Sequence, residues 1–558
     1  MKSFLFLCVL FLSAASLFAQ SYTRTLAGCD AAKAVFDGSD KIASGIDGAE
    51  NLYIAGYSKS GTSSLPSAVY IRKYSKAGTL IWETKEPLKA NTPYPVNKTF
   101  AFTVYKNGES VIAFNTYTAP DMNIQISKFD SSGKKLWQNG FNSYRNIDDE
   151  QPRKIITDTS GNIYLLLTES YDRNRYISSY VLKYGFRGVY IWNRELTGAK
   201  LNDTTYTNYT ATDFTVDSAG SVYVTGNYQR PGSQYTDIYT YKLFNYGTVA
   251  WSKVVSGDNG TDSRGYTIRF AKQDNTVVMC GTTRKAKDSL VVIKYKTLSN
   301  GKEVWNAKFP TQDSGFIGHS LIDADNNIFF TTAFNVHPAK EAYVSKVSSS
   351  GALVWNKIAF PIAANSQYDP CQSFDAQTDL AGNYYTTFNK NGRVLLQKYD
   401  KLGNILFQDT YGPGSDTTGG THILYGGLSI TPNQDIYLTS LFYNSNDLTT
   451  NTCRAKYKLN KNSLLADEKS SGKMAPALSS LPAGILYPNP ARNVVNLSAS
   501  VIAVTNSIRM YDATGRQVAQ RQLSSGQTKI DVSTLKPGVY TLQLLAGTQQ
   551  LTYKFIKE

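Results

Sequence analysis

Apolar residues alternate with polar ones, or run continuously, over segments of about eight residues through most of the chain. The stretch from residue 210 to 256 shows four such segments, at 210–217, 221–228, 237–244 and 248–256, each bounded by Gly, Asp, Asn or Ser. This pattern predicts β-strands joined by hairpins. A turn of the form Asp-x-x-Gly suits such a hairpin, because the carboxylate accepts bonds from backbone N–H groups and the Gly adopts a positive φ.

The four-segment pattern recurs along the chain. Five copies carry a clear turn-and-strand signature: "DGAENLYIAG", "DTSGNIYLLL", "DSAGSVYVTG", "DADNNIFFTT" and "DLAGNYYTTF". Three weaker copies read "KNGESVIAF", "QDNTVVMCG" and "TPNQDIYLTS" and bring the number to eight. The third segment of every copy contains a lysine: Lys73, Lys128, Lys183, Lys242, Lys294, Lys346, Lys398 and Lys456. Self-similarity of this kind indicates a repeat architecture.

Each of the six tryptophans follows a glycine by four residues: Trp82, Trp137, Trp192, Trp251, Trp305 and Trp355. The seventh copy has Phe407 at this place, and the eighth has no such segment. A counterpart of the missing segment lies near the N-terminus, where Tyr22 to Gly28 ("YTRTLAG") follows the pattern of "WNRELTG". We therefore expect Tyr22–Ala27 to pair beside residues 454–459 and to close the last copy.

A single four-stranded sheet cannot bury both of its faces, so the copies must pack against one another, and a ring achieves this without long exposed edges. The sequence therefore predicts an all-β fold, with a β-propeller of about eight blades over residues 20–462. The pattern D-x-x-G-N-x-Y-x-x-G, followed by x-K-Y/F-x-x-x-G-x-x-x-W, resembles the SBBP-type bacterial β-propeller repeat over residues 22–460. Lys106 and Thr431 stand where Asp is usual. The resemblance implies architecture rather than activity.

The segment D-x-x-G-x-x-x-W also resembles the tryptophan-docking repeats of eight-bladed quinoprotein dehydrogenases. Cofactor binding in those enzymes commonly involves a disulfide between adjacent cysteines, and no Cys-Cys pair occurs in this sequence. We therefore predict no cofactor. We interpret each tryptophan as a packing residue that buries a large ring between neighbouring blades.

The N-terminus has the layout of a secretory signal peptide. Lys2 precedes an apolar run from Phe4 to Leu12, and small residues lead to Ala19. We expect cleavage near Ala19, so that residues 1–19 are removed and no transmembrane segment remains. Four cysteines are then left, and their three pairings stay open: Cys29, Cys280, Cys371 and Cys453. Cys280 lies in a strand-like segment and reads as a buried thiol.

The last part of the chain predicts a second domain. Residues 463–485 are rich in Ser, Ala, Lys and Pro and are typical of an exposed linker. Residues 486–558 contain short alternating strands separated by turns, such as "NSIRMYD", "TKIDV" and "LTYKFIKE". This pattern predicts a small Ig-like antiparallel β-sandwich.

These residues resemble the type A C-terminal sorting domain of the type IX secretion system of Bacteroidetes-like bacteria. The matching pieces are "YPNPA", "MYDATGR", "LKPGVY" and "KFIK". The positions that carry the resemblance are Tyr487, Pro488, Asn489, Pro490, Ala491, Gly515, Gly538, Tyr540, Lys554 and Lys557. The resemblance implies recognition by the outer-membrane translocon and its sortase-like peptidase, with the protein secreted or attached to the outer face of the outer membrane. An accessory Ig-like binding module is the alternative.

The formal net charge of +15 raises the question of an acidic partner. The eight repeated lysines account for part of the excess, and they permit two interpretations. They form either a ring of solvated lysines that discourages edge pairing, or a symmetric basic band that holds acidic polysaccharide, lipopolysaccharide or DNA. The loops Glu169–Tyr176 and Asn227–Asp237 mix Tyr with Arg and can stack on sugars.

Candidate catalytic groups are sparse. The three histidines show no metal-binding spacing, and no G-x-S-x-G elbow, P-loop or C-x-x-C motif occurs. Asp323–Asn327 faintly resembles a calcium loop but occupies the ordinary hairpin position, so we interpret it as a turn and predict no metal. We therefore expect a monomeric binding or scaffold protein that is not an enzyme. The alternative is an extracellular lyase or glycosidase acting on polysaccharide, with carboxylates converging at the channel mouth.

Overall fold

The structure is a computed structural model in two compact units, Met1–Leu459 and Asn460–Glu558. The residues it describes are 22–32, 42–59, 66–88, 99–118, 121–143, 149–171, 176–196, 208–229, 232–257, 261–285, 287–310, 315–335, 340–361, 373–390, 392–412, 421–444, 449–459, 486–487, 491–497, 507–512, 516–522, 529–546 and 549–558. They form 39 β-strands and one short 3-10 turn, η1 (Ser299–Gly301). The predicted signal peptide 1–19 and linker 463–485 lie outside these residues.

The first unit contains eight blades, each with four antiparallel strands. Blade 1 comprises β2 (Ile42–Ile46), β3 (Leu52–Lys59), β4 (Pro66–Tyr74) and β5 (Leu80–Pro87). Blade 2 comprises β6 (Phe100–Val104), β7 (Ser110–Thr118), β8 (Asp121–Phe129) and β9 (Lys135–Phe141). Blade 3 comprises β10 (Asp149–Thr157), β11 (Ile163–Tyr171), β12 (Tyr176–Tyr184) and β13 (Tyr190–Glu195). One parallel pairing, Asp149 with Met122, joins blades 2 and 3 into an eight-stranded sheet.

The remaining blades repeat this arrangement. Blade 4 comprises β14 (Tyr209–Val216), β15 (Val222–Gln229), β16 (Thr236–Leu243) and β17 (Val249–Val255). Blade 5 comprises β18 (Ser263–Ala271), β19 (Thr276–Lys285), β20 (Lys287–Lys296) and β21 (Glu303–Pro310). Blade 6 comprises β22 (Gly315–Ile322), β23 (Ile328–Asn335), β24 (Lys340–Val347) and β25 (Leu353–Pro361). Blade 7 comprises β26 (Ser373–Thr378), β27 (Tyr384–Lys390), β28 (Arg393–Tyr399) and β29 (Ile405–Tyr411). Blade 8 comprises β30 (Thr421–Ile430), β31 (Ile436–Asn444), β32 (Thr449–Leu459) and β1 (Tyr22–Ala32).

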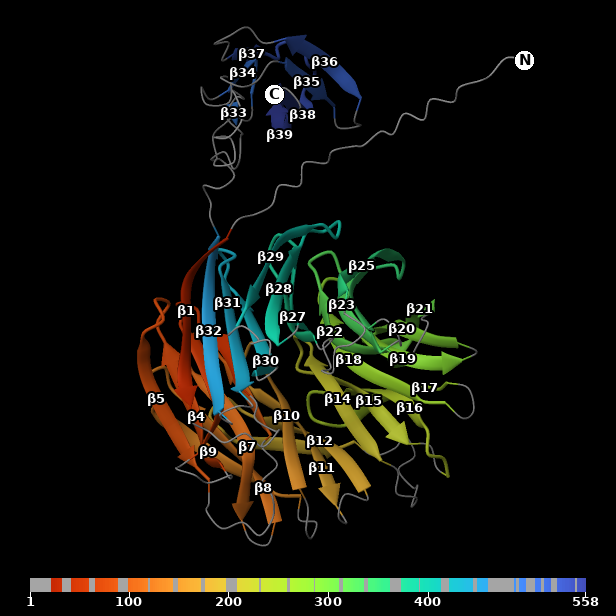
Figure 1. The fold of residues 1–558 in the computed structure, drawn as a ribbon. Helices are drawn as coiled ribbons and strands as arrows, with labels where there is room; N and C mark the ends of the chain where they lie inside the picture. Colours follow the sequence, from red (N-terminus) through yellow and green to blue (C-terminus); the bar gives the residue numbers. More distant parts are fainter. Residues whose placement is uncertain are drawn as a thin grey trace, which may run out of the picture. The chain divides into compact units, whose positions relative to one another are not determined.

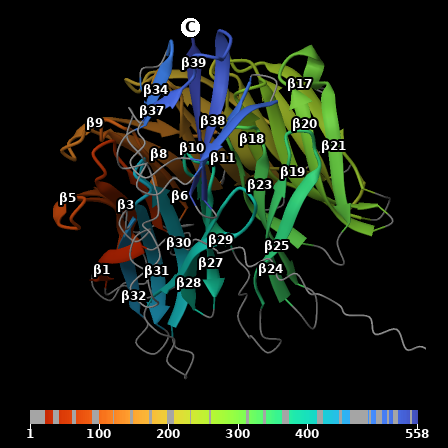
Figure 2. The same cartoon turned by 90° about the horizontal axis from the view of Figure 1, so that it is seen from above.

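The blades form a ring. The first strand of each blade contacts the first strand of the next, in the order β2, β6, β10, β14, β18, β22, β26 and β30, and β30 contacts β2 again. These eight are therefore the inner strands, and the blades follow one another in chain order (Figures 1 and 2). The predicted all-β fold with an eight-bladed propeller is confirmed.

Blade 8 takes its fourth strand from the N-terminus. β1 lies beside β32 (Figure 1), with Tyr22 opposite Leu459 and Ala32 opposite Thr450. We expected the N-terminal strand beside the last copy, because that copy lacks an outer segment of its own. The register corrects the alignment with the tryptophan segments, however, because Leu26 rather than Tyr22 lies opposite Lys456. No hairpin turn joins β1 to β32, so no turn fixes its register.

The cysteines occupy different settings. Cys453 on β32 is disulfide-bonded, and Cys29 on β1 lies opposite it in the strand register. Cys280 on β19 is a fully buried free thiol, and burial raises its pKa to about 11. Cys371 lies outside the described residues. A disulfide fits an exported protein, because disulfides persist in oxidising compartments.

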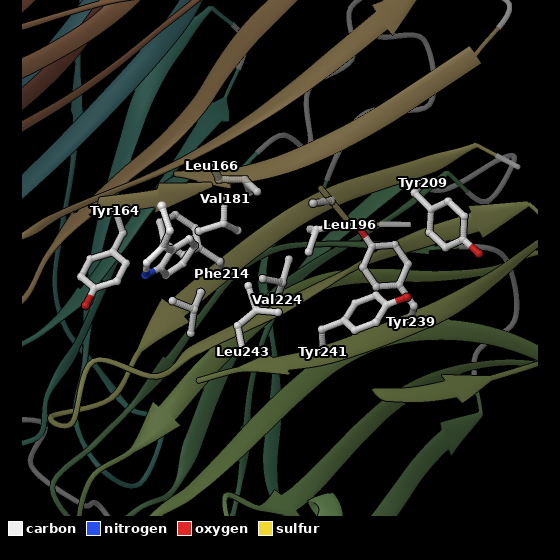
Figure 3. Packing of buried hydrophobic residues seen from close by; sticks show 13 residues of the cluster. Tyr164, Leu166, Val181, Leu196, Tyr209, Phe214, Val224, Tyr239, Tyr241 and Leu243 are labelled. Carbon is white, nitrogen blue, oxygen red and sulfur yellow. The ribbon is translucent and has the colours of Figure 1, made fainter. Parts of the chain in front are cut away.

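The hydrophobic core of the propeller lies between blades. Between blades 3 and 4, Tyr164, Leu166 and Val181 pack with Phe214 and Val224 (Figure 3). Figure 3 shows other members of the same cluster, namely Leu196, Tyr209, Tyr239, Tyr241 and Leu243. Each blade thus buries its faces against its neighbours, which is the physical reason for the ring.

Blades 8 and 1 share a cluster of the same kind. Ile54 and Tyr70 of blade 1 belong to one buried cluster with Tyr437 and Leu441 of blade 8. The first and last blades are therefore packed like the others.

The second unit is a small antiparallel β-sandwich, as predicted. One sheet contains β33 (Leu486–Tyr487), β34 (Val494–Leu497) and β37 (Lys529–Asp531). The other contains β36 (Gln517–Gln522), β35 (Ser507–Tyr511), β38 (Gly538–Ala546) and β39 (Gln549–Lys557). Val495 and Ile530 of the first sheet share a buried cluster with Met510, Leu542 and Phe555 of the second. In the described parts of both units, no helix is long and apolar enough to cross a membrane.

Candidate functional site

Each tryptophan docks on the next blade. Its indole Nε1 donates a hydrogen bond of 2.8–3.3 Å to a backbone carbonyl in the turn between the third and fourth strands of that blade. The accepting carbonyls, from blade 2 to blade 7, belong to Ser131, Phe186, Asn245, Thr297, Ser349 and Lys401. The structure therefore places every tryptophan of the sequence at a junction between blades.

A glycine in the same turn lies against each indole. A Cβ atom on it would come within 2.6–2.9 Å of the tryptophan ring, and the backbone φ is positive at 64–91°. The six are Gly133, Gly188, Gly247, Gly301, Gly351 and Gly403. Both the close approach and the left-handed backbone require glycine at this place. In blades 2 to 6, the glycine that precedes the tryptophan is thus the docking surface for the tryptophan of the preceding blade, and Gly403, which precedes Phe407, has the same role in blade 7.

The repeated lysines are buried, and this corrects both interpretations of their charge. All eight are only 0–9% exposed, so they form neither a solvated ring nor a basic band. In the first six copies the ammonium group donates at 3.0–3.3 Å to the same carbonyl that accepts the tryptophan bond. The physical reason is that a lysine beside the junction can satisfy a buried carbonyl of the next blade.

Turn carboxylates balance these buried ammonium groups. Lys73 lies 3.4 Å from Asp47, and Lys398 lies 3.7 Å from Asp379. Lys73 also lies over the Tyr53 ring, 5.1 Å from its centroid. Burial lowers the pKa of Lys398 to about 8, against the charge of Asp379. The charged groups of the repeated lysines therefore join neighbouring blades.

The Asp turns have the predicted hydrogen bonds, and in the Asp323 turn Asn326, with a φ of 59°, takes the place of the glycine. Asp323 Oδ1 accepts bonds from the backbone N–H groups of Asp325 and Asn327 at 2.9 and 2.8 Å, and the Asn327 side chain donates to Oδ2 at 2.9 Å. This carboxylate acts as a turn cap, as the hairpin interpretation requires. Among the described residues, no group of three His, Cys, Asp or Glu side chains is placed to hold a metal ion.

A charged cluster on the inner strands does not belong to the repeat. Lys154 of β10 donates to Asp213 Oδ1 at 2.6 Å, and Arg269 of β18 pairs with Oδ2 of the same carboxylate. Burial alone would raise the pKa of Asp213, but the charges of Arg269 and Lys154 outweigh burial and hold this pKa at about 2. The cluster ties blades 3, 4 and 5 together and carries one net positive charge.

Asp375 occupies the same place in blade 7 as Asp213 in blade 4. Its carboxylate accepts bonds from the N–H groups of Leu428 and Ala376 at 2.9 and 2.8 Å. Burial raises the pKa of Asp375 to about 7, although these bonds and the charge of Arg269 oppose the shift. The two carboxylates lie three blades apart, and each is bound to the backbone of a following blade.

Sequence reasoning missed this cluster, although a signal was present. Lys154, Asp213 and Asp375 each stand four residues before the Asp of their own turn, and the first blade has Ala43 at that position. A charged residue at an inner-strand position that is apolar in other copies marks a departure from the repeat. The loops proposed for sugar stacking are only partly visible, since 172–175 and 230–231 lie outside the described residues.

The sorting positions fall mainly at two edges of the sandwich. Tyr487 lies in β33, and Ala491 is fully buried and forms a parallel bridge with Lys557 of β39. The Ala491 N–H donates to the Ile556 carbonyl at 2.8 Å.

The other sorting positions are spread over the same unit. Gly538 begins β38, Tyr540 is buried in it and donates to the Lys536 carbonyl at 2.8 Å, and Lys554 lies in β39. Pro488, Asn489, Pro490 and Gly515 lie outside the described residues.

These features define the class of protein: a β-propeller joined to a C-terminal β-sandwich that carries sorting motifs. Residues 485–558 match the family described as the secretion system C-terminal sorting domain. The sorting domain predicted from the sequence is thereby confirmed, and the match supports export by the type IX route. No curated protein matches the chain. The SBBP-type repeat remains a prediction.

Several solved structures are similar to this chain at low identity. A Bacteroides caccae protein of unknown function is 12% identical, with 55% of this chain and 93% of that chain covered and a TM-score of 0.29. Puromycin hydrolase is 11% identical, with 74% and 59% covered and a TM-score of 0.42. Prolyl oligopeptidase B from Galerina marginata is 8% identical, with 73% and 56% covered and a TM-score of 0.40.

These matches correct one prediction. The expectation that the protein is not an enzyme is contradicted, because the similar structures include a hydrolase and an oligopeptidase. At these identities and TM-scores they establish no activity for this chain.

Proposed function

We propose that this protein is a binding or scaffold propeller that works outside the cell, delivered there by its C-terminal sorting domain. The observation that carries the proposal is the match of residues 485–558 to the secretion sorting family. The disulfide at Cys453 supports an oxidising destination. We expect the signal peptide 1–19 to be removed first, and the sorting domain to be recognised by the translocon and its peptidase. The protein is then released or attached to the outer face of the outer membrane as a monomer.

A truncation tests the route. In a bacterium that has a type IX system, the chain ending at residue 485 is expected to accumulate in the periplasm, whereas the full chain reaches the surface or the medium. Fusion of residues 460–558 to a periplasmic reporter is expected to carry the reporter outside. Export of the truncated chain at the full-length level would contradict the proposal. Fractionation of the wild type distinguishes surface attachment from release.

We expect the ligand to bind away from the repeated lysines, because these side chains are buried at the blade junctions. A propeller presents unrepeated side chains on a rigid repeated scaffold, and such side chains are the natural ligand contacts. We propose glycan as the ligand class. Binding of the purified full chain to a glycan array, with no binding to heparin or DNA, is the expected result.

A further inference from the structure

One junction between blades contains a cavity. It has a volume of about 530 Å³ and lies between the end of β9 in blade 2 and strands β12 and β13 of blade 3. Four aromatic residues line it: Phe141, Tyr180, Tyr184 and Tyr190. This volume falls in the range of small-molecule sites, about 300–1,000 Å³.

The equivalent space between blades 1 and 2 is filled by polar side chains. Glu86 Oε2 accepts hydrogen bonds from Gln125 Nε2 at 2.9 Å and from Lys135 Nζ at 2.8 Å, and Glu86 is 4% exposed. The blades can be aligned on the repeated lysine and the tryptophan that pairs with it. In this alignment, the residues between blades 2 and 3 that replace Glu86, Gln125 and Lys135 are Phe141, Tyr180 and Tyr190. Three rings thus stand where blades 1 and 2 have a polar triad around the buried Glu86.

The glycine of the lining contributes only its backbone. Gly140 lies opposite Gln125 in the strand register, and the Gln125 side chain reaches Glu86 of blade 1. Because paired residues on neighbouring strands share one face of the sheet, a side chain at position 140 would face blade 1 and not the cavity. The cavity is therefore shaped by its four rings, Phe141, Tyr180, Tyr184 and Tyr190.

Burial and contacts between rings hold the aromatic residues of the cavity in place. Tyr180 is 6% exposed and lies 5.9 Å from Phe141 between ring centroids. Tyr184 is 1% exposed and meets Tyr190 edge-on at 5.7 Å. Tyr190 itself is 50% exposed, so its ring stands at the mouth. Rigid aromatic residues of this kind give a preformed apolar surface.

Neutral polar groups accompany the rings. Asn139, Asn142 and Asn193 line the cavity, and amides both donate and accept hydrogen bonds. Glu195 also lines it and accepts a bond from Ser178 Oγ at 3.0 Å. The lining contains no Lys or Arg among the described residues. This set matches a ligand with flat C–H faces and many hydroxyls, and its one carboxylate disfavours an anion.

We infer that this cavity is a binding site for a neutral oligosaccharide, with Tyr190 stacked on a sugar ring and the asparagine amides bonded to its hydroxyls. The inference deepens the proposed glycan-binding function and rests on it. Its test uses purified full-length protein, so a failure of export cannot imitate a failure of binding.

Titration calorimetry with cellotriose, maltotriose and mannotriose tests the site, with trigalacturonic acid as the acidic comparison. We expect at least one neutral trisaccharide to bind and the acid to bind more weakly. Tyr190→Ala is expected to lower the affinity at least tenfold, and Phe141→Glu, which introduces the residue of blade 1, to abolish binding. Leu80→Ala is the matched control, because Leu80 holds the equivalent position in blade 1 and is 48% exposed.

The outcomes separate the two proposals. Glycan-array binding that Tyr190→Ala and Phe141→Glu leave unchanged overturns this site and keeps the proposed function. Absence of binding by any neutral glycan overturns both. Preference for the acidic trisaccharide overturns the neutral class. If Phe141→Glu does not unfold cooperatively, Tyr190→Ala decides alone, since Tyr190 is half-exposed.

Discussion

Six of the eight junctions between blades share one design, and the junction between blades 7 and 8 has another. Between blades 4 and 5, the Thr297 carbonyl accepts bonds from Trp251 at 3.3 Å and Lys242 at 3.0 Å. The indole lies on Gly301, whose Cβ position would come within 2.7 Å of the ring. At this junction the repeated residues, the turn that contains the glycine and the packing of the indole all serve the same contact between blades.

Between blades 7 and 8 the same elements meet a different partner. Lys398 donates to the Tyr22 hydroxyl at 3.1 Å and to Gln434 Oε1 at 2.8 Å. Phe407 packs on the Tyr22 ring, with centroids 4.6 Å apart. No turn links β32 to β1, so no turn carbonyl or glycine is present to receive them. The N-terminal strand therefore supplies both the missing edge and the missing acceptor.

Removal of β1 is expected to have the largest effect. A chain that starts at residue 33 leaves β32 as an unpaired edge and deprives Lys398 of Tyr22. Compared with a chain that starts at residue 20, it is expected to lose cooperative thermal unfolding and to elute as aggregate in size-exclusion chromatography. A monomer of unchanged stability would contradict the closure.

Trp251→Ala is expected to cost about 3–5 kcal/mol, because it removes a buried ring and leaves a cavity. Phe407→Ala is expected to cost less, because Phe407 is half-buried. Urea unfolding of the two variants measures the difference. Equal losses, or a larger loss at Phe407, would show that the two junction types do not differ as described.

Loss of the Cys453 disulfide is expected to lower stability by about 2–4 kcal/mol, since it constrains the unfolded chain. Cys453→Ser and reduction of the wild type should give the same shift of the urea midpoint. Peptide mapping without reduction is expected to recover Cys453 linked to Cys29, its neighbour in the register. A link to another cysteine would refute this arrangement.

The smallest expected effect is a pH dependence specific to the junction between blades 7 and 8. The folded-state pKa of Lys398 is about 8, below the ordinary 10.5, so the unfolded state binds more protons above pH 8 and stability rises with pH. Tyr22, whose pKa burial raises to about 12, acts in the opposite sense only above its ordinary 10.0.

The measurement is the difference in unfolding free energy between the wild type and Lys398→Met from about pH 8 to 10, below the ordinary pKa of Tyr22. The wild type should gain stability relative to Lys398→Met. Lys85→Met, at a side chain 53% exposed, is the control and should follow the wild type. An unchanged difference between the wild type and Lys398→Met would contradict the assignment.

The sequence predicted the features that every copy shares. The hairpin turn and the strand order repeat because each blade meets the same surroundings, and the number of copies gives the number of blades. The missing outer segment after Lys456 also pointed to Tyr22 as a strand partner. These predictions needed only periodicity and the rule that sheets cover their edges.

The remaining features depend on contacts between copies. Lys73 reads as a polar face of its strand, but its acceptor is the Ser131 carbonyl, 58 residues away. Neither the segment of Lys73 nor that of Ser131 contains a sequence feature that identifies the other as its partner. The cavity arises where Phe141 of one blade meets the tyrosines of the next, and Asp213 is explained only when Lys154 and Arg269 are placed beside it.

Hydrogen exchange of the N-terminal strand tests the central claim most directly. If β1 is the outer strand of blade 8, the amides of Tyr22–Ala32 that face β32 are expected to be protected to the same degree as those of Thr449–Leu459 in full-length protein. Exchange of residues 22–32 at the rate of an unstructured peptide, beside a protected β32, would contradict a ring closed by the N-terminus.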